Sequence, residues 1–287
     1  MTEPILDVSD TAFWVAHCRA LESERPDALF HDPFSARLAG ERGRMITEAM
    51  ALSRIIIWTM AIRTCIIDDM LRSAIARGVD TVLNLGAGLD ARPYRMELPA
   101  SLSWVEADYP RIVEHKERTL EGEAPRCRLE RVKLDLADTK ERRALFARVN
   151  AGAKQIFVLT EGVIPYLSVE EVAPLADELL ALGRVRYWLV DYFSPAAKKY
   201  RDRKGATRQM RNAPFRFDPA DWFGFFEEHG WRFREVRYLA EEAERLGRPI
   251  PLPLLVKIAM KLAAPFLPKE RRAAMKHFAG YVLLEPF

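Results

Sequence analysis

The sequence has few cysteines, no long apolar run and no excess of one charge. Its three cysteines, Cys18, Cys65 and Cys127, are scattered over 287 residues. This spacing excludes a disulfide framework and supplies no metal-ligand motif, so no metal is expected. No segment reaches the roughly 18 uninterrupted apolar residues of a membrane-spanning helix. The nearest, 252–268, is interrupted by two lysines and a proline, and we expect no integral membrane contact.

The charge balance and the first residues exclude two further classes. Lysine and arginine number 44 against 41 aspartates and glutamates, a net charge of +3, and the basic residues are spread along the chain. Nucleic-acid binding proteins gather basic residues on one face, so no nucleic-acid partner is expected. The first ten residues lack the basic and apolar regions of a secretory signal, which predicts a cytoplasmic protein. The sequence carries no signal for an oligomeric state.

The first 78 residues are predicted to be almost entirely helical and to form an N-terminal cap. Asp10 precedes a segment of apolar periodicity and is expected to cap a helix. Asp32 followed by Pro33 predicts a second helix, with the proline at its first position. Apolar residues then recur at helical spacing from residue 45 to Gly78.

From residue 79 to the end, short β-rich runs alternate with helical ones, which predicts an α/β domain with a parallel sheet. The expected strands are 81–85, 102–108, 129–135, 155–161, 186–192, 231–240 and 280–287. The last two are separated by proline-rich and helical sequence, so the C-terminal strand is expected to return to the edge of the sheet. The domain 79–287 thus has predicted insertions at about 193–218 and 241–279.

A glycine turn follows the first expected strand, in the stretch VLNLGAGLDARPYR. Gly86 and Gly88 would let the backbone approach a ligand closely, outside the carboxyl end of the strand. The motif GAGLDA also satisfies the dinucleotide fingerprint with alanine in third place, so an NAD-binding oxidoreductase stays open on the glycines alone.

Acidic residues follow the next three strands and favour a different ligand. Asp108 lies about 20 residues beyond the glycines, where a carboxylate accepts ribose hydroxyls. Asp135 and Glu161 follow the third and fourth strands. S-adenosylmethionine requires close backbone, a carboxylate for its ribose, a slot for adenine and charges for its amino-acid end. A second acid after the third strand is not required for NAD, and a long helical leader is unusual for a dehydrogenase, so we expect S-adenosylmethionine.

Five ordered motifs resemble a known family. They are RTCIID (63–68), VLNLGAGLDARPYR (82–95), WVEADYPRIVEHK (104–116), KLDLAD (133–138) and LTEGVIPYLSVEEV (159–172). In this order they resemble the leucine carboxyl methyltransferase family, and most closely its bacterial branch of S-adenosylmethionine-dependent O-methyltransferases, which includes enzymes of the tetracenomycin polyketide type. The resemblance implies a class I methyltransferase, Rossmann-like fold. Its sheet would have seven mostly parallel strands with an antiparallel last strand, a helical N-terminal extension and a helical insertion before that strand.

The resemblance also implies roles for individual residues in binding the donor. Arg63, assisted by Arg19, would pair with the carboxylate of the methionine part, and Glu161 would help to fix the same end. The backbone of Gly86 would accept the amino group and Asp108 would hold the ribose. The full set of expected donor-binding residues is Arg19, Arg63, Gly86, Ala87, Gly88, Asp108, Tyr109, Asp135, Leu136 and Glu161.

The methyl acceptor and any catalytic base are less defined by the sequence. A carboxylate acceptor needs no base, whereas a hydroxyl does. Tyr166, Tyr192 and His17 are weak candidates, each with a packing role as the alternative. Arg92 and Arg95 are read as structural ion-pair partners, and the aromatic segment 221–231 as core rather than as a substrate box.

The leading hypothesis is an enzyme that methylates an oxygen, in a carboxylate or a hydroxyl, of a small molecule such as a polyketide-like metabolite. Two alternatives stay open. A protein C-terminal carboxyl methyltransferase would need an open groove for a peptide end, and a non-catalytic S-adenosylmethionine-binding protein would have its acceptor side walled off.

Overall fold

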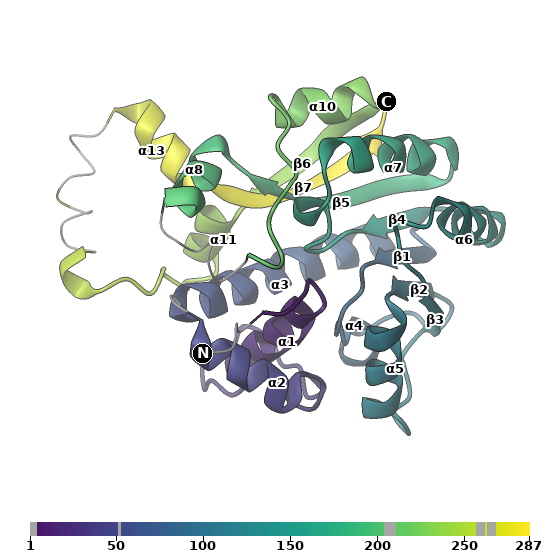
Figure 1. The fold of residues 1–287 in the computed structure, drawn as a ribbon, viewed down its shortest axis with the longest axis horizontal. Helices are drawn as coiled ribbons and strands as arrows, with labels where there is room; N and C mark the ends of the chain where they lie inside the picture. The colour runs from purple at the N-terminus through teal and green to yellow at the C-terminus, as the bar shows by residue number, and fades with distance from the viewer. Residues whose placement is uncertain (1–4, 51–52, 204–210, 257–261, 263–267) are drawn as a thin grey trace.

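The computed structural model describes residues 5–50, 53–203, 211–256, 262 and 268–287. Its centre is a seven-stranded sheet of order β3-β2-β1-β4-β5-β7-β6 (Figure 1). The strands are β1 (Thr81–Leu85), β2 (Ser103–Asp108), β3 (Arg128–Lys133), β4 (Ile156–Leu159), β5 (Val185–Phe193), β6 (Trp231–Tyr238) and β7 (Ala279–Pro286). The helices are α1 (Asp10–Ser23), α2 (Ser35–Ala49), α3 (Ser53–Ala76), α4 (Arg92–Arg95), α5 (Pro110–Thr119), α6 (Thr139–Gly152), the 3-10 turn η1 (Ile164–Tyr166), α7 (Val169–Ala181), α8 (Pro195–Arg203), α10 (Trp222–Glu228), α11 (Leu239–Arg245) and α13 (Lys269–Lys276).

The strand directions agree with the alternating sequence pattern. β1 runs parallel to β2 and β4, β2 to β3, and β4 to β5. β7 is antiparallel to both of its neighbours, β5 and β6. The predicted seven-stranded, mostly parallel sheet with an antiparallel last strand is therefore confirmed.

Helices cover both faces of this sheet, and successive strand residues face opposite layers. Leu83 belongs to the core layer that includes side chains of α6, α7 and α10, whereas its neighbour Val82 belongs to the layer that includes side chains of α3 and α11. The segment 221–231 belongs to the first layer: the ring of Trp188 on β5 lies 5.4 Å from Phe226 and 5.3 Å from Trp231, edge to face. The interpretation of these aromatics as core is confirmed.

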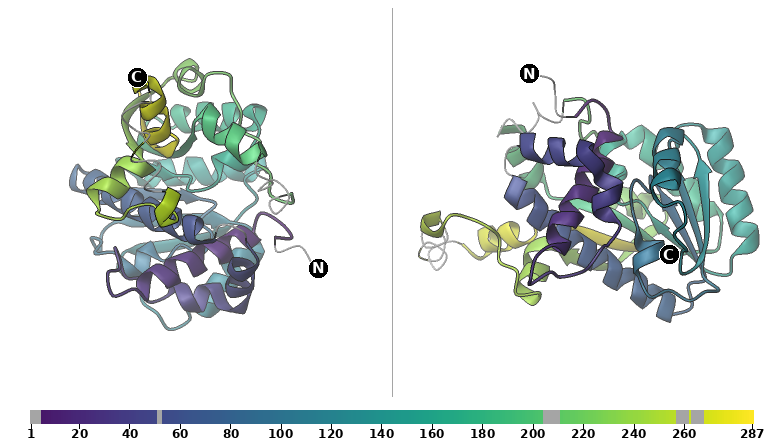
Figure 2. Two further views of the ribbon diagram at one scale, coloured as in Figure 1. Left: turned by 90° about the vertical axis from the view of Figure 1, so that its left-hand side faces the viewer. Right: turned by 90° about the horizontal axis from the view of Figure 1, so that it is seen from below.

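The helical N-terminal segment is confirmed, but two predicted helix starts differ. α1 and α2 lie side by side beyond one end of the strands (Figures 1 and 2). α1 begins at Asp10 itself, because that carboxylate accepts the Leu6 N–H and pairs with Arg42 instead of capping the helix. α2 begins after Pro33, although Asp32 accepts two backbone N–H groups at this turn.

The last strand does not form an edge, contrary to the prediction. β7 lies between β5 and β6, and β6 is the edge strand. Burial explains this order: the apolar β7 has all of its residues but the last buried, whereas β6 exposes Arg232, Phe233 and Arg234. Charged side chains on an edge strand oppose pairing with another chain.

The two insertions are described in part. α8 follows β5, while residues 204–210 lie outside the described residues. Between β6 and β7, α11 packs on the sheet beside α3, and the stretches 257–261 and 263–267 are likewise not described. Of the described helices, none combines the length and apolar character needed to cross a bilayer.

Candidate active site

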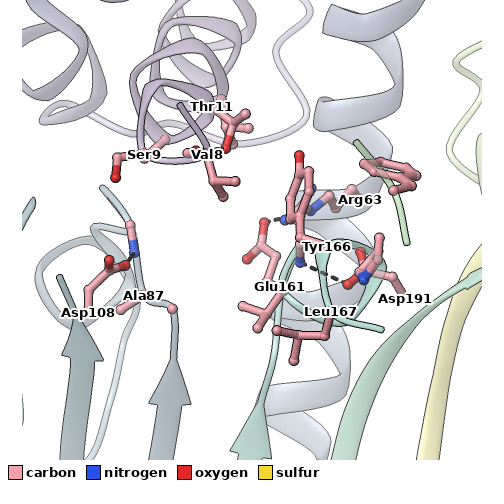
Figure 3. A pocket seen from close by; sticks show the side chains of 18 of the residues that line it. Val8, Ser9, Thr11, Arg63, Ala87, Asp108, Glu161, Tyr166, Leu167 and Asp191 are labelled. Carbon is pink, nitrogen blue, oxygen red and sulfur yellow. Dashed lines mark hydrogen bonds and ion pairs between the residues drawn. The ribbon is translucent and has the colours of Figure 1, made fainter. Parts of the chain in front are cut away.

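A cavity of about 580 Å³ lies where the carboxyl ends of the parallel strands meet α1 and α3. Figure 3 shows Asp108 and Ala87 on one side of it, Arg63, Glu161 and Asp191 on the other, and Val8, Ser9 and Thr11 across its top. All ten residues expected to bind the donor line this one cavity: Arg19, Arg63, Gly86, Ala87, Gly88, Asp108, Tyr109, Asp135, Leu136 and Glu161. The fold thus brings the predicted set together, and the ligand contact of each residue stays a prediction.

The glycine turn after β1 is shaped by backbone that favours glycine. Gly86 and Gly88 have φ values of +63° and +50°, in the left-handed region. A Cβ on Gly86 would lie 2.4 Å from Cγ2 of Val163. Close packing and the backbone dihedral angles therefore both favour glycine in this turn. The backbone of the two glycines, which carries no side chain, lines the cavity.

Asp108 at the end of β2 is tied to the same turn. Its Oδ2 accepts the Gly88 N–H at 2.6 Å and its Oδ1 accepts the Tyr109 N–H at 2.7 Å. Burial raises the pKa of Asp108, and these two backbone donors oppose that rise. The carboxylate is thus fixed in orientation at the edge of the cavity, where its remaining lone pairs can accept further hydrogen bonds.

The residues after β3 form the wall beyond Asp108. Asp135 is exposed and its Oδ1 accepts the Ala137 N–H at 2.9 Å, while Leu136 is half-buried. A polar group beside an apolar side chain is the arrangement expected for an adenine slot.

Glu161 is the charged centre at the opposite end of the cavity. Its Oε1 lies 2.7 Å from Nε of Arg63 and 3.0 Å from Nη2 of Arg19, and its Oε2 lies 2.5 Å from Nη1 of Arg92. Burial by itself raises the pKa of Glu161, but Arg63, Arg92 and Arg19 together hold it well below its usual range. Arg19 and Arg63 share this one carboxylate, and each keeps further N–H donors that an anionic ligand could accept.

A second layer of buried charge fixes Arg92. Its side chain is fully buried, and it pairs with Asp68 on α3 at 2.6 Å and with Asp90 at 2.8 Å. Arg95 lies 2.7 Å from the other oxygen of Asp68. The reading of both arginines as structural ion-pair partners agrees with this geometry, but Arg92 also contacts Glu161 in the cavity wall. Arg63, which lies on the same helix as Asp68, pairs with Glu161 instead.

Two of the three weak catalytic candidates lie away from the cavity. Tyr192 points to the opposite face of the sheet, where its ring lies 5.3 Å from Trp222 and 5.4 Å from Phe223. His17 lies on α1 against α2, close to Gly43, and burial lowers its pKa. Neither is among the residues that line the cavity, whereas Tyr166 is.

Sequence reasoning missed two side chains of the cavity wall. Asp191 at the end of β5 and Tyr281 at the start of β7 both line it. The acid in the strand RYWLVDY was a usable signal, because side chains at the carboxyl ends of parallel strands face the ligand site. Tyr281 had no such signal, since its place follows from the unexpected position of β7.

Comparisons with known proteins bear on this site. Residues 12–180 match the model of the leucine carboxyl methyltransferase family. A protein of Parafrankia sp. (strain EAN1pec) is 35% identical over 268 residues, covering 85% of this chain and 83% of its own. One of Mycolicibacterium paratuberculosis is 31% identical over 272 residues, covering 85% of each chain. Both bear the name "Putative S-adenosyl-L-methionine-dependent methyltransferase".

Solved structures support the fold. A DUF574 family protein from Streptomyces avermitilis aligns with a TM-score of 0.56 at 14% identity, covering 95% of this chain and 97% of its own. A structure described as a "putative methyltransferase" from Thermobifida fusca aligns with a TM-score of 0.50 at 15% identity, covering 99% and 96%. At these identities the likeness concerns the class I, Rossmann-like fold alone. The family model and the relatives together settle the membership: this chain belongs to the leucine carboxyl methyltransferase family.

Proposed function

We propose that this chain transfers the methyl group of S-adenosylmethionine to an oxygen, in a carboxylate or a hydroxyl, of a small-molecule acceptor. Dependence on S-adenosylmethionine and methyl transfer follow from the family and from the relatives' names; the oxygen and the small molecule are the proposal. One observation carries it: a single cavity is lined by all the residues expected to bind the donor and by an additional apolar wall.

The residues present fit the donor from end to end. The glycine turn offers backbone without side chains, and Asp108 offers a fixed carboxylate for the ribose hydroxyls. Arg63 and Arg19 would hold the carboxylate of the methionine part with the N–H donors that their shared partner Glu161 leaves available. Asp135 and Leu136 would flank the adenine. A donor held in this way would lie along the ends of β3, β2, β1 and β4.

The bound donor supplies an electrophilic methyl group on a positively charged sulfur. The residues of this chain supply orientation, which can lower a barrier by roughly 7–11 kcal/mol, and a site from which water is excluded. Residues 8–15 and α3 cover the cavity and support that second role. Two ion pairs connect this N-terminal segment to neighbouring helices. Asp10 lies 2.6 Å from Arg42 of α2, and Asp7 lies 3.1 Å from Arg111 of α5.

The apolar wall lies on the side of the cavity away from Asp108. Tyr166, Phe193 and Phe215 contribute rings to it, with Tyr166 5.1 Å and Phe193 5.4 Å from Phe215. Met60 of α3 and Leu239 extend it. A covered cavity with aromatic walls supports a compact, largely apolar acceptor, and we favour it over the end of a protein chain.

Calorimetric titration with S-adenosylhomocysteine and with NAD tests the donor site. We expect the first ligand to bind and the second not to. Arg63→Ala and Asp108→Ala should weaken binding at least tenfold, whereas Arg25→Ala, which removes an exposed arginine paired with Asp27, serves as the control and should bind as wild type. Binding of NAD alone would contradict the proposal.

A mass-spectrometric assay of methyl transfer tests the acceptor. Small carboxylic acids and phenols are compared with a peptide that ends in a leucine carboxylate. We expect methyl esters or ethers of the small molecules. Methylation of the peptide alone would favour the protein-directed alternative, and tight donor binding without transfer to any acceptor would favour a non-catalytic role.

A further inference from the structure

Asp191 lines the cavity and is not among the residues expected to contact the donor. It lies near the end of β5, one strand beyond β4, and pairs in register with Tyr281 on β7. Both side chains line the cavity, on the face of the sheet that α3 covers. Figure 3 shows Asp191 below Arg63 and beside Glu161, across the cavity from Asp108.

The hydrogen bonds of Asp191 fix one oxygen and leave the other available. Its Oδ2 accepts the Gly162 N–H at 2.8 Å. Within the described part of the chain no hydrogen bond reaches its Oδ1, and this atom is not among the fully buried polar atoms without a partner. The whole residue is only 4% exposed. A buried carboxylate that is held by one oxygen and presents the other to a cavity is placed to accept a proton.

The surroundings of Asp191 make it a stronger base than a surface carboxylate. Burial raises its pKa to about 6, against the attraction of Arg63 from α3 and the Gly162 N–H. Glu161 from the loop after β4 adds to the rise, and Tyr281 faces it from β7. The group is therefore ionised at neutral pH and still close to the pH at which a general base works best.

The chemistry of the same wall favours one kind of acceptor. The cavity that Asp191 lines is also lined by the aromatic side chains Phe193 and Tyr166 and by the apolar start of β7. A flat apolar molecule bearing a hydroxyl group could place its ring against these side chains and its hydroxyl at Oδ1. An acceptor carboxylate in the same place would meet a second negative charge in a buried site, which is strongly unfavourable.

We propose, on the basis of the function proposed above, that Asp191 is the general base for a hydroxyl acceptor of the phenol class. The acceptor oxygen forms a bond to the methyl carbon with one of its electron pairs. The bond between that carbon and the sulfur breaks with its pair remaining on sulfur, which becomes neutral. The hydroxyl proton passes to Oδ1 of Asp191 and then to solvent, and the products are a methyl ether and S-adenosylhomocysteine.

The test compares wild type with Asp191→Asn on matched probes, 2-naphthol against 2-naphthoate and 4-methylphenol against 4-methylbenzoate. Asparagine keeps the size of the side chain and an oxygen for the Gly162 N–H but cannot take the proton. Asp177→Asn is the matched control, because that aspartate is exposed on α7 and pairs with His229. Affinity for S-adenosylhomocysteine is measured on all three proteins by calorimetry.

We expect ether formation from the phenols and little ester formation from the acids. Wild type should lose kcat/KM below about pH 6, where Asp191 becomes protonated. Asp191→Asn should lower kcat on the phenols roughly 100-fold to 1000-fold, leave the Kd of S-adenosylhomocysteine within about threefold, and lack this dependence on pH. Asp177→Asn should match wild type in all three measurements.

Three results would overturn the base role while leaving the proposed function intact. The first is an unchanged kcat in Asp191→Asn, and the second is turnover of the carboxylates alone. The third is a loss of affinity for S-adenosylhomocysteine of tenfold or more, which would place Asp191 on the donor. Failure of wild type to bind S-adenosylhomocysteine would instead refute the proposed function, and binding without turnover of any probe would refute both.

Discussion

Glu161→Gln should destabilise the protein strongly, because it removes the charge that three buried arginines share. The side chain of Glu161 is 7% exposed, and those of Arg63 and Arg92 are 10% and 0% exposed. Removing one partner from a buried ion pair costs about 3–5 kcal/mol, since the remaining charge stays uncompensated. Asp90 and Asp68 still pair with Arg92, so we expect the lower end of that range. This is a large share of the 5–15 kcal/mol that usually stabilises a domain.

Glu171→Gln makes the same chemical change at the mouth of the same cavity and serves as the control. Glu171 pairs with Arg216 at 3.0 Å, but the two side chains are 44% and 50% exposed. Exposed pairs contribute about 0–1 kcal/mol. Glutamine also retains the capping box at the start of α7, in which Glu171 accepts the Ser168 N–H. We expect this variant to lose less than about 1 kcal/mol.

Urea unfolding measured at several pH values checks the reasoning. The folded-state pKa of Glu161 lies well below the ordinary value of 4.5. Its contribution is therefore fully present above that value and is lost as the pH falls below it. The gap between wild type and Glu161→Gln should narrow in acid. A loss no larger than that of Glu171→Gln at pH 7, or a gap that does not change with pH, would refute the charge argument.

Three further predictions concern other parts of the site. Asp191→Asn should stabilise the protein above pH 6, because the folded-state pKa of Asp191 is about 6 and its ordinary value is 3.8, so the stability of wild type falls as the pH rises between those values. At about 1.36 kcal/mol per pKa unit, the variant gains about 3 kcal/mol. Urea unfolding at pH 4 and pH 8 measures this gain, which should vanish below pH 4. Gly86→Ala should cost about 2–5 kcal/mol, since it combines left-handed strain with a contact on Val163. Gly122→Ala is the control: Gly122 has a φ of +83°, and a new Cβ there would meet open space, so this substitution should cost only about 1–2 kcal/mol. If both glycine variants lose the same free energy of unfolding in chemical denaturation, the contact with Val163 is unimportant. Asp108→Asn should raise the Kd of S-adenosylhomocysteine roughly tenfold to a hundredfold by weakening charged hydrogen bonds, and an unchanged Kd in calorimetry would remove Asp108 from the donor site.

The sequence was most informative where the chemistry is local. Strand and helix periodicity gave the alternating fold, and the residues after β1 to β4 gave a set that the structure gathers into one cavity. Both results depend on short-range rules: side chains alternate along a strand, and the carboxyl ends of parallel strands meet at one edge of the sheet. Gly86, Asp108 and Glu161 could be named because each lies at the end of a strand or within two residues beyond it.

Predictions that depended on long-range packing were less accurate. Tyr192 was a candidate because it follows a strand, but the strand continues to Phe193 and turns Tyr192 toward the aromatic layer on α10. His17 lies two residues before Arg19 on α1, but its side chain faces α2 instead of the cavity. In both cases one residue of register or one turn of helix decides which face a side chain occupies, and periodicity does not fix that to a single residue.

The sequence by itself determined the fold class, the family and a group of donor-binding candidates, because these depend on ordered local motifs. Only the tertiary structure decided that β7 lies inside the sheet, that Arg19, Arg63 and Arg92 meet on Glu161, and that Asp191 and Tyr281 share a wall of the cavity. Each of these arrangements joins residues far apart in the chain. Their meeting is set by which apolar faces are buried together, and no local pattern records it.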